Sequence, residues 1–595
     1  MNAKSRVTTF LVVGSIGLAF LFFVFYYRFS FNYELGMNEQ YKLIFVLPVV
    51  AAVLGLAMPG GGSNRLYAIV PGMLIALGLL LLSGGKYSFS NEHGWAIAAC
   101  GLLAMGMFWS AGQEIIVAIF VMVFIVQLSL GCMQLYDAVL TGQSASRLLQ
   151  GSLQNSGVFG CYLVIQLPLA IWLVRRYVDG KLGKTVALII SSVAIGLMCV
   201  TGSRTACIAL AATMAAGLCG YYRENLARVL KTWPSLATWG LILAGTAAVA
   251  GGAYALFGIK RMSATGRLLK LQVAGAHWAD HWWWGTGPGR FSWYYPCWQA
   301  AYFRENPEPP AAFVMSAGES YILFNEFLQI FEETGLVGLF IFVAMMIAVF
   351  TAKSVKHNAL LNAVKLTVVA VLASGLTSYP FHVNAITLIF MICCVLSVAL
   401  RENRLLPRLH LVVPVKFLRL YVAVAVMVLV AAFCRGAREL SAVCRWGQVA
   451  GVELPDTETG SEYAALYPVL RNNGKFLTDY GQWLSRDSAR CKDAVIVLER
   501  AKAYFTSRKT MEATAAAYAQ LGQFDTALRH RIWICQFLPN RFMPRYELLK
   551  TYEAMRDTLN ARKVAQDILR MPVKVQSAEV YDVLEAARRT LGQQK

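Results

Sequence analysis

The sequence is short of charged residues for a chain of 595. Only 15% of its residues are Asp, Glu, Lys or Arg, against about 25% in ordinary globular proteins, whereas 57% are hydrophobic. This shortage excludes a single soluble domain. It is also uneven, because the chain up to about residue 434 consists mostly of apolar runs of roughly 16–24 residues, which can cross a hydrocarbon core of about 30 Å. No such run follows, so the composition predicts a polytopic membrane region followed by a soluble domain.

Acidic residues are the scarcer of the two charged classes. The chain has 33 Asp and Glu against 54 Lys and Arg, a formal net charge of +21, and no Asp-x-Asp motif. We therefore predict neither a metal site nor a cofactor. Many basic residues lie in short loops between apolar runs, as the positive-inside rule describes for cytoplasmic loops. No basic stripe or motif indicates nucleic-acid binding, so we do not expect a nucleic-acid partner.

Two further signals are missing. None of the thirteen cysteines shows C-x-x-C spacing, which argues against a zinc site, and a disulfide among Cys297, Cys444, Cys491 and Cys535 stays open. The first apolar run, at about residues 8–27, carries no small-residue cleavage site. We interpret it as a retained anchor rather than a signal peptide.

The basic loops define a topology. With a cytoplasmic N-terminus and alternating sides, the basic loops fall inside, including the one that carries Arg175 and Arg176. The segment at about 260–325 and the loops that hold Arg147 and Arg204 then fall outside. Because the number of predicted spans is odd, the C-terminal domain also falls outside. The thirteen predicted spans are approximately 8–27, 43–58, 66–82, 95–110, 115–133, 156–174, 184–200, 205–221, 235–258, 328–351, 361–379, 383–400 and 417–434.

The soluble part shows a countable period. Tyr518 and Tyr552 are 34 residues apart, as are Ala527 and Ala561. Tyr518 begins a Y-x-x-L-G pattern. This spacing is typical of tetratricopeptide repeats, in which helix pairs hide their apolar faces by stacking. We predict a membrane domain at 1–434, a linker at 435–455 and a helical repeat domain at 456–595 that binds a protein partner. A generic helical bundle is the alternative.

The predicted outside segment concentrates residue types that bind anions and sugars. Three tryptophans precede the sequence GTGPG, which contains Gly287 and Gly289 and is followed by Arg290. Glycines let backbone N–H groups approach an anion closely, and arginine binds phosphate oxygens in pairs. The same residues are compatible with a tight turn and with an aromatic belt at the membrane surface. No βαβ context surrounds the glycines, so the motif is not a dinucleotide fingerprint.

The order of several motifs resembles the O-antigen ligase/polymerase superfamily. GTGPGRF is followed about 35 residues later by FNEFLQIFEETGLVGL, which enters a membrane helix. LLQGSLQNSGVFGCYL and TGSRTACIALAA upstream, and SYPF near residue 380, are similar to the family's other recurring segments. The resemblance covers roughly residues 140–400.

This resemblance implies an all-α glycosyltransferase of the bacterial inner membrane. Such enzymes transfer a glycan from a polyprenyl diphosphate carrier to an acceptor on the extracytoplasmic side, without a metal. Arg204 and Arg267 match the family's arginines and would bind the donor diphosphate. Arg147 and Arg290 are further candidates for the same role. Arginines that merely reach lipid headgroups are the alternative interpretation.

One residue departs from the family's pattern. The histidine that usually precedes the asparagine of this motif, and is the usual candidate base, is Phe324 here. Asn325 follows it and is one of the predicted catalytic residues. Glu319, Glu326 and His277 are the candidates to replace it as the base that activates an acceptor hydroxyl. The alternative for His277 is packing against aromatic rings.

The sequence therefore predicts transfer of a lipid-linked glycan to an acceptor hydroxyl. The acceptor is predicted to be a lipid, as in O-antigen ligases, with a protein or a growing glycan chain as alternatives. A transporter of lipid-linked sugars and an inactive scaffold are the rival hypotheses. We see no internal duplication of the kind that transporters often show.

Overall fold

A computed structural model describes residues 113–153, 155–222, 261–287, 290–400, 402, 438, 441–450 and 457–592. Every regular element among these residues is a helix, and no strand occurs among them. The all-α prediction is confirmed. Predicted spans in residues 1–110, at 235–258 and at 417–434 lie outside the described part of the chain.

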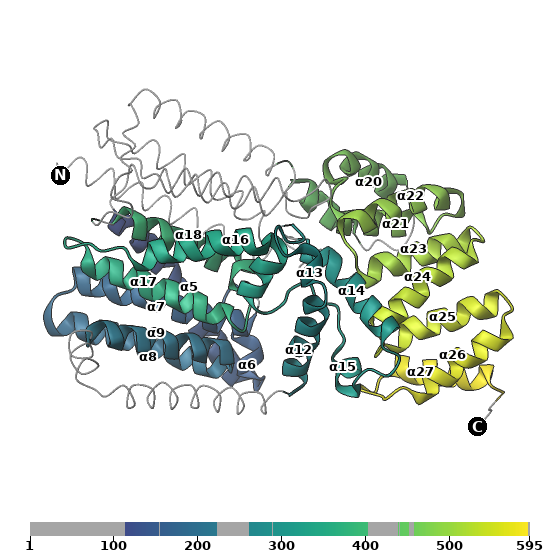
Figure 1. The fold of residues 1–595 in the computed structure, drawn as a ribbon, viewed down its shortest axis with the longest axis horizontal. Coiled ribbons are helices and arrows are strands. Elements are labelled where there is room, and N and C mark those ends of the chain that lie inside the picture. Colours follow the sequence, from purple (N-terminus) through teal and green to yellow (C-terminus); the bar gives the residue numbers. More distant parts are fainter. Residues whose placement is uncertain are drawn as a thin grey trace.

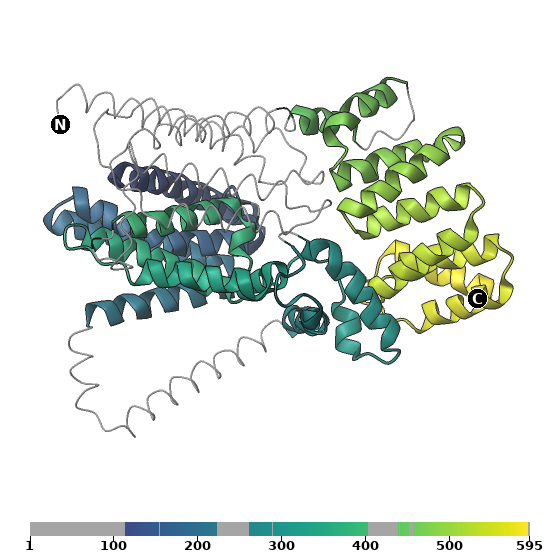
Figure 2. The same cartoon turned by 45° about the horizontal axis from the view of Figure 1, so that its top comes forward.

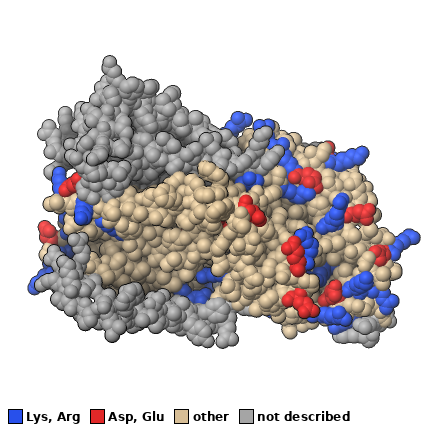
Figure 3. All heavy atoms as spheres, in the orientation of Figure 1, with Lys and Arg blue, Asp and Glu red and all other residues tan. Residues whose placement is uncertain are grey.

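Apolar helices form a bundle, drawn at the left of Figure 1. Six of them are long and apolar enough to cross a membrane, which makes this a multi-pass membrane protein. Charged side chains gather on the C-terminal domain and leave a broad uncharged band over the bundle (Figure 3). The helices of the bundle in the described chain are α5 (Gln113–Thr141), α7 (Ser156–Tyr177), α8 (Gly180–Thr201), α9 (Arg204–Tyr221), α16 (Glu326–Phe350), α17 (Asn358–Gly375) and the shorter α18 (Asn384–Ala399).

Helix α7 lies at the centre of this bundle. Its apolar residues run all round the helix, and it packs against α5, α8, α9 and α17. Small residues permit the close approach, since a Cβ added at Gly160 would lie 2.7 Å from the Thr201 hydroxyl. The connections are short, as between α8 and α9, where Gly202 ends α8 at a φ of 63°. Successive helices therefore run in opposite directions.

The alternating directions place the loops at two ends of the bundle. One end holds the turns around residues 142–155, 202–203 and 376–383 and the segment 261–325. The other end holds the Arg176–Glu114 ion pair at 3.0 Å and the hydrogen bond from Ser354 to Glu402 at 2.7 Å. This division agrees with the predicted alternation over α5–α18. Which end faces the cytoplasm stays a prediction.

The segment between α9 and α16 contains a small helical unit of its own. Leu269, Val273, Phe291, Tyr295 and Trp298 form its buried core, in which Phe291 and Tyr295 are fully buried. Its helices are α12 (Arg261–Gly275), α13 (Trp278–His281), α14 (Phe291–Glu305) and α15 (Ala311–Ser316).

The C-terminal domain is a stack of helices at the right of Figures 1 and 2. Each helix packs against the next one in sequence. Its cysteines are free thiols, and so is Cys297. The helices are α20 (Thr457–Leu470), α21 (Gly474–Leu484), α22 (Cys491–Tyr504), α23 (Arg508–Gln520), α24 (Phe524–Phe537), α25 (Phe542–Ala554), α26 (Thr558–Arg570) and α27 (Ala578–Thr590).

Backbone geometry in this domain repeats at the predicted spacing of 34 residues. The carbonyl of Tyr518 accepts from the amide of Gln523, and the carbonyl of Tyr552 accepts from that of Asp557, both at 2.9 Å. Ala527 of α24 and Ala561 of α26 are both buried. Helix pairs α23–α24 and α25–α26 are thus structurally equivalent. The tetratricopeptide assignment and the exact domain boundaries stay predictions.

Candidate functional site

Helices α7, α9 and α16 begin at the same end of the bundle, and each begins with a side-chain cap. Asn155 accepts a hydrogen bond from an amide of α7 at 3.1 Å, Ser203 from an amide of α9 at 3.3 Å, and Asn325 from an amide of α16 at 3.0 Å. These caps satisfy amides that a helix start leaves without partners. The Asn325 predicted to act in the site therefore has at least a structural role.

The three helix starts converge on the turn that follows α17. Asn155 donates to the hydroxyl of Tyr379 at 3.3 Å, and Asn325 donates to the carbonyl of Leu376 at 3.2 Å. The Ser203 hydroxyl lies 3.2 Å from the carbonyl of Gly157 in α7. Each helix start carries a partial positive charge, so their convergence creates a favourable place for an anion.

Basic side chains add full charges to this place. Arg204 is the first residue of α9, and its neighbour Thr205 bonds Thr377 at 3.1 Å. Arg267 of α12 lies close enough to Arg204 for the two charges to interact. Burial lowers the pKa of Arg267, and the positive charge of Arg204 lowers it further. The structure thus brings together the two arginines that sequence motifs single out.

Lys270 is a third cation that the motifs did not reveal. It lies one turn after Arg267 on α12, a spacing that places both on one face of the helix. Burial, followed by the charge of Arg267, lowers the pKa of Lys270 to about 7. Its ammonium lies 4.0 Å from the ring centre of Phe324, and the Arg267 guanidinium lies 5.3 Å from it. Helical spacing was the signal that could have identified it.

Phe324, which stands where the resemblance predicts a histidine, connects these cations to the turn after α17. Its ring meets that of Tyr379 edge to face at 5.3 Å. Its φ of 58° lies in the left-handed region, which is uncommon for a bulky side chain. The residue is therefore held in a specific orientation, with an aromatic face toward Lys270.

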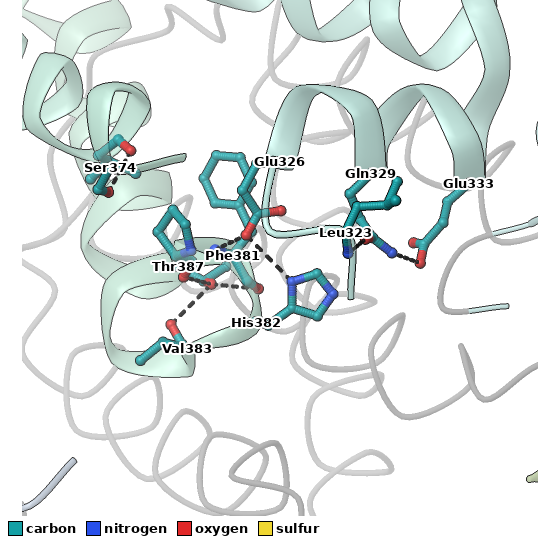
Figure 4. A network of polar contacts seen from close by, with 11 residues as sticks. Leu323, Glu326, Gln329, Glu333, Ser374, Phe381, His382, Val383 and Thr387 are labelled. Carbon is teal, nitrogen blue, oxygen red and sulfur yellow. Dashed lines mark hydrogen bonds and ion pairs between the residues drawn. The ribbon is translucent and has the colours of Figure 1, made fainter. Parts of the chain in front are cut away.

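Glu326 pairs with a histidine that sequence reasoning missed. The Glu326 side chain is 3% exposed, and its Oε1 accepts from the amide of Phe381 at 2.7 Å (Figure 4). Nδ1 of His382 lies 3.3 Å from the same oxygen. Burial acts to lower the pKa of His382, but the carboxylate of Glu326 more than offsets this, and the pKa is raised. His382 follows SYPF directly, which was the available signal.

Neighbouring polar contacts hold this pair in place. Thr387 donates to the carbonyl of Phe381 at 3.0 Å, which orders the short helix η2 (Pro380–His382). Gln329 accepts from the amide of Leu323 at 2.9 Å and donates to Glu333 at 2.7 Å, as Figure 4 shows. Hydrogen bonds thus fix both the turn that contacts Glu326 and the backbone at Leu323, just before it in the chain.

The glycine-rich sequence GTGPG contacts helix α16. Helix α16 is interrupted at Gly335, whose φ is 65° and ψ −166°. There the amide of Gly287 donates to the carbonyl of Glu333 at 2.9 Å, and the amide of Leu336 donates to the carbonyl of Trp282 at 2.8 Å. Because the Gly287 amide already has this partner, the geometry does not favour the predicted anion contact through it. Gly289 lies outside the described residues.

The remaining candidates lie in other surroundings. His277 stacks on Trp298 at 4.6 Å and pairs with Asp280 at 3.3 Å, the aromatic packing that was its alternative interpretation. Arg290 lies over aromatic rings of α14, and Arg147 is exposed on α6 (Ala145–Leu148).

Glu319 accepts hydrogen bonds from the Tyr321 hydroxyl and from the amide of Arg508 in the C-terminal domain, the latter at 2.9 Å. The structure therefore gives Glu319 a contact between domains in addition to its predicted role as a base. Among the described residues, no group of three or more His, Cys, Asp or Glu side chains could hold a metal ion.

A bundle of apolar helices with Arg204, Arg267 and Lys270 close together at one end defines the class: a multi-pass membrane protein with a cluster of cationic side chains at that end. Residues 186–343 match the family model described as O-Antigen ligase. The comparison with curated proteins gives no match. Residues 186–343 thus form a domain similar to O-antigen ligases, and the predicted resemblance to this superfamily is confirmed over that range. This domain supports a glycan-transferring, ligase-like function. The matched range contains Arg204, Arg267, Lys270, Phe324 and Glu326, whereas His382 follows it.

Proposed function

We propose that the protein transfers a glycan from a polyprenyl diphosphate carrier to an acceptor hydroxyl on the extracytoplasmic face of the bacterial inner membrane. The observation that carries this proposal is the convergence of three helix starts with Arg204, Arg267 and Lys270, the last two of which lie over the Phe324 ring. Such a site fits a diphosphate, whose charge grows as the glycosyl bond breaks. The family match supports a glycan as the transferred group.

The cations would bind the diphosphate and stabilise it as a leaving group. A guanidinium donates two parallel hydrogen bonds to phosphate oxygens, so Arg204 and Arg267 orient the group as well as neutralise it. Lys270, with a pKa of about 7, is partly neutral before the donor binds. A bound diphosphate favours its protonated form and raises that pKa, so donor binding takes up protons at neutral pH.

His382 and Glu326 would activate the acceptor. The acceptor oxygen forms a bond to the anomeric carbon while the bond from that carbon to the diphosphate oxygen breaks. The proton of the acceptor hydroxyl passes to the imidazole of His382. The carboxylate of Glu326 orients the ring and stabilises the imidazolium that forms. This pair supplies a base that Phe324 cannot provide.

For the acceptor we favour a lipid, as in O-antigen ligases, with a protein hydroxyl or a growing chain as alternatives. All three supply a hydroxyl, and the described site does not distinguish them by charge. A protein acceptor or an assembly partner is the proposed ligand of the C-terminal domain.

Reconstitution tests the proposal directly. Purified protein in vesicles, supplied with a polyprenyl-diphosphate oligosaccharide and a candidate acceptor, is expected to release polyprenyl diphosphate and to add the glycan mass to the acceptor. Mass spectrometry of both products checks the balance. Movement of an intact carrier across the bilayer, with no cleavage, would instead support a transporter.

The orientation has its own test. Basic residues lie at the end of the bundle opposite the site, for example beside the Arg176–Glu114 pair. We expect a reporter fused after residue 440 to be active only outside the cytoplasm and one fused near residue 356 only inside. Cytoplasmic activity of the first fusion would contradict the thirteen-span topology.

A further inference from the structure

Residues 317–323, which we name the connecting segment, link α15 to the site. The segment contains no regular secondary structure and leads directly into Phe324 and Asn325. Its two ends, Ala317 and Leu323, are 3% and 5% exposed. An irregular segment of this length has considerable conformational freedom unless other parts of the molecule hold it. Its position therefore depends on what it contacts.

The C-terminal domain supplies those contacts from the start of α23, the α24–α25 connection and the α26–α27 connection. The amide of Arg508 donates to Glu319 at 2.9 Å, and Asn540 donates to the carbonyl of Ala317 at 2.8 Å. Asn540 and Lys574 also donate to the carbonyl of Met315, just before the segment, both at 3.2 Å. The three donors are spaced 32 and 34 residues apart, so equivalent positions of consecutive helix pairs face the same stretch of chain.

A buried interface beside the segment fixes the domain against α14. Gln299 is 1% exposed, donates to the carbonyl of Phe537 at 2.7 Å and accepts from the Tyr295 hydroxyl at 2.9 Å. Trp293 donates to the carbonyl of Lys502 at 2.9 Å. Apolar packing of Ala300, Phe537 and Leu538 accompanies these bonds. Buried, satisfied hydrogen bonds of this kind define one relative position of two units.

The other end of the segment belongs to the site. The amide of Leu323 donates to Gln329 in the first turn of α16, and Phe324 then meets Arg267 and Lys270. Between the two ends, the Tyr321 ring packs against Phe505 of the C-terminal domain with centres 5.1 Å apart. Displacing the domain would therefore release the backbone that leads into Phe324 and Glu326.

We propose that the C-terminal domain is a positioning element of the transfer site, acting through the connecting segment. It holds residues 317–323 so that Phe324 and Glu326 lie where the cations and His382 meet them. Glu319 is a positioning residue in this arrangement and accepts bonds from both sides of the interface. The domain is then required for transfer to every acceptor, small or large. This inference rests on the proposed function.

Two substitutions of Glu319 separate positioning from base catalysis. Glu319→Gln keeps an oxygen that can accept from Arg508 and Tyr321 but cannot act as a base, and Glu319→Ala loses both properties. We expect Glu319→Ala to lower kcat by about 10- to 100-fold with the donor KM changed less than about threefold, because small displacements of reacting groups have effects of this size. Glu319→Gln is expected to stay within about threefold of the parent in kcat.

A measurement independent of activity accompanies the kinetics. Hydrogen exchange in residues 317–324 of the full-length protein is expected to rise in Glu319→Ala and in Asn540→Ala. It is expected to stay unchanged in Arg589→Ala, which alters an exposed pair remote from the interface. Equal loss of kcat in Glu319→Gln and Glu319→Ala, with unchanged exchange in both, would overturn the proposal and make Glu319 the base. If hydrogen exchange rises in these variants but the parent protein shows no transfer at all, the contact that positions the segment is supported and the proposed function is rejected.

Discussion

Replacing Arg204 by alanine is expected to lower the rate of glycan transfer by about 10²–10³, with normal insertion into the membrane. A preorganised contact to a leaving group that gains charge typically contributes this much. Arg204 stands at the start of α9, where the helix dipole and the neighbouring Arg267 would act on the same anion in the proposed mechanism. Water cannot replace the lost charge well at the edge of a membrane. Turnover measured in reconstituted vesicles checks the result.

Arg267→Lys tests whether the shape of the guanidinium group matters in addition to its charge. Lysine keeps the charge but cannot grip two phosphate oxygens with one planar group, so we expect severe impairment despite the conserved charge. Arg304→Ala is the matched control, because Arg304 lies exposed on α14 and pairs only with its neighbour Glu305 in the described contacts. Full activity of Arg267→Lys would show that charge alone suffices.

Transfer is also expected to survive an excess of EDTA, since cationic side chains stabilise the leaving group in the proposed mechanism. Measuring turnover before and after chelation, with protein integrity followed by size-exclusion chromatography, checks this. Loss of transfer on chelation, followed by recovery on adding a divalent ion, would contradict the role of the arginines.

His382→Gln is expected to lower turnover by about 10²–10⁴, the usual contribution of a general base. Donor binding should change little, because His382 acts on the acceptor. The substitution retains a polar side chain in the turn that Phe381 and Thr387 order. His357→Gln serves as the control, since His357 directly precedes α17 at the opposite end of the bundle. Unchanged turnover in His382→Gln would return the role to Glu319, Glu326 or His277.

The role of His382 as a base also predicts how the transfer rate depends on pH. A base works in its neutral form, so activity falls as the pH drops below its pKa. Glu326 raises the pKa of His382 above the ordinary value of about 6.5, and the acid limb of the rate profile should therefore lie above that pH. Glu326→Gln removes the negative charge, so the pKa falls and the acid limb moves to lower pH, with a lower plateau rate. If the acid limb does not move in Glu326→Gln, Glu326 does not interact with the group whose titration controls the rate.

Several parts of the site could be predicted because their signals are local in sequence. Arg204 directly follows a helix end, and Arg267 begins the long segment between two apolar runs. Lys270 could have been added from its spacing on the same helix. The position of His382 directly after SYPF was a signal as well, but its pairing could not be predicted, because Glu326 is 56 residues away in the chain and meets it only across the turn after α17.

For Glu319 and the glycine motif, local sequence suggested a role, but the fold shows contacts that the sequence did not reveal. A carboxylate five residues before Phe324 is a reasonable candidate base from spacing alone. Only the fold reveals that the C-terminal domain, far away in sequence, donates to it from Arg508. Likewise, the GTGPG sequence suggests an anion-binding turn, whereas Gly287 bonds the interruption of α16 in the structure.

The sequence by itself determined the class of this protein: long apolar runs require a membrane, alternation of basic loops predicts the topology, and a period of 34 residues predicts stacked helix pairs. These properties depend on composition and local spacing, which tertiary contacts do not alter. Only the tertiary structure decided which helix starts converge, which histidine meets Glu326 and what holds the connecting segment. Those contacts join residues up to 259 positions apart, and they form only when helices distant in sequence pack together.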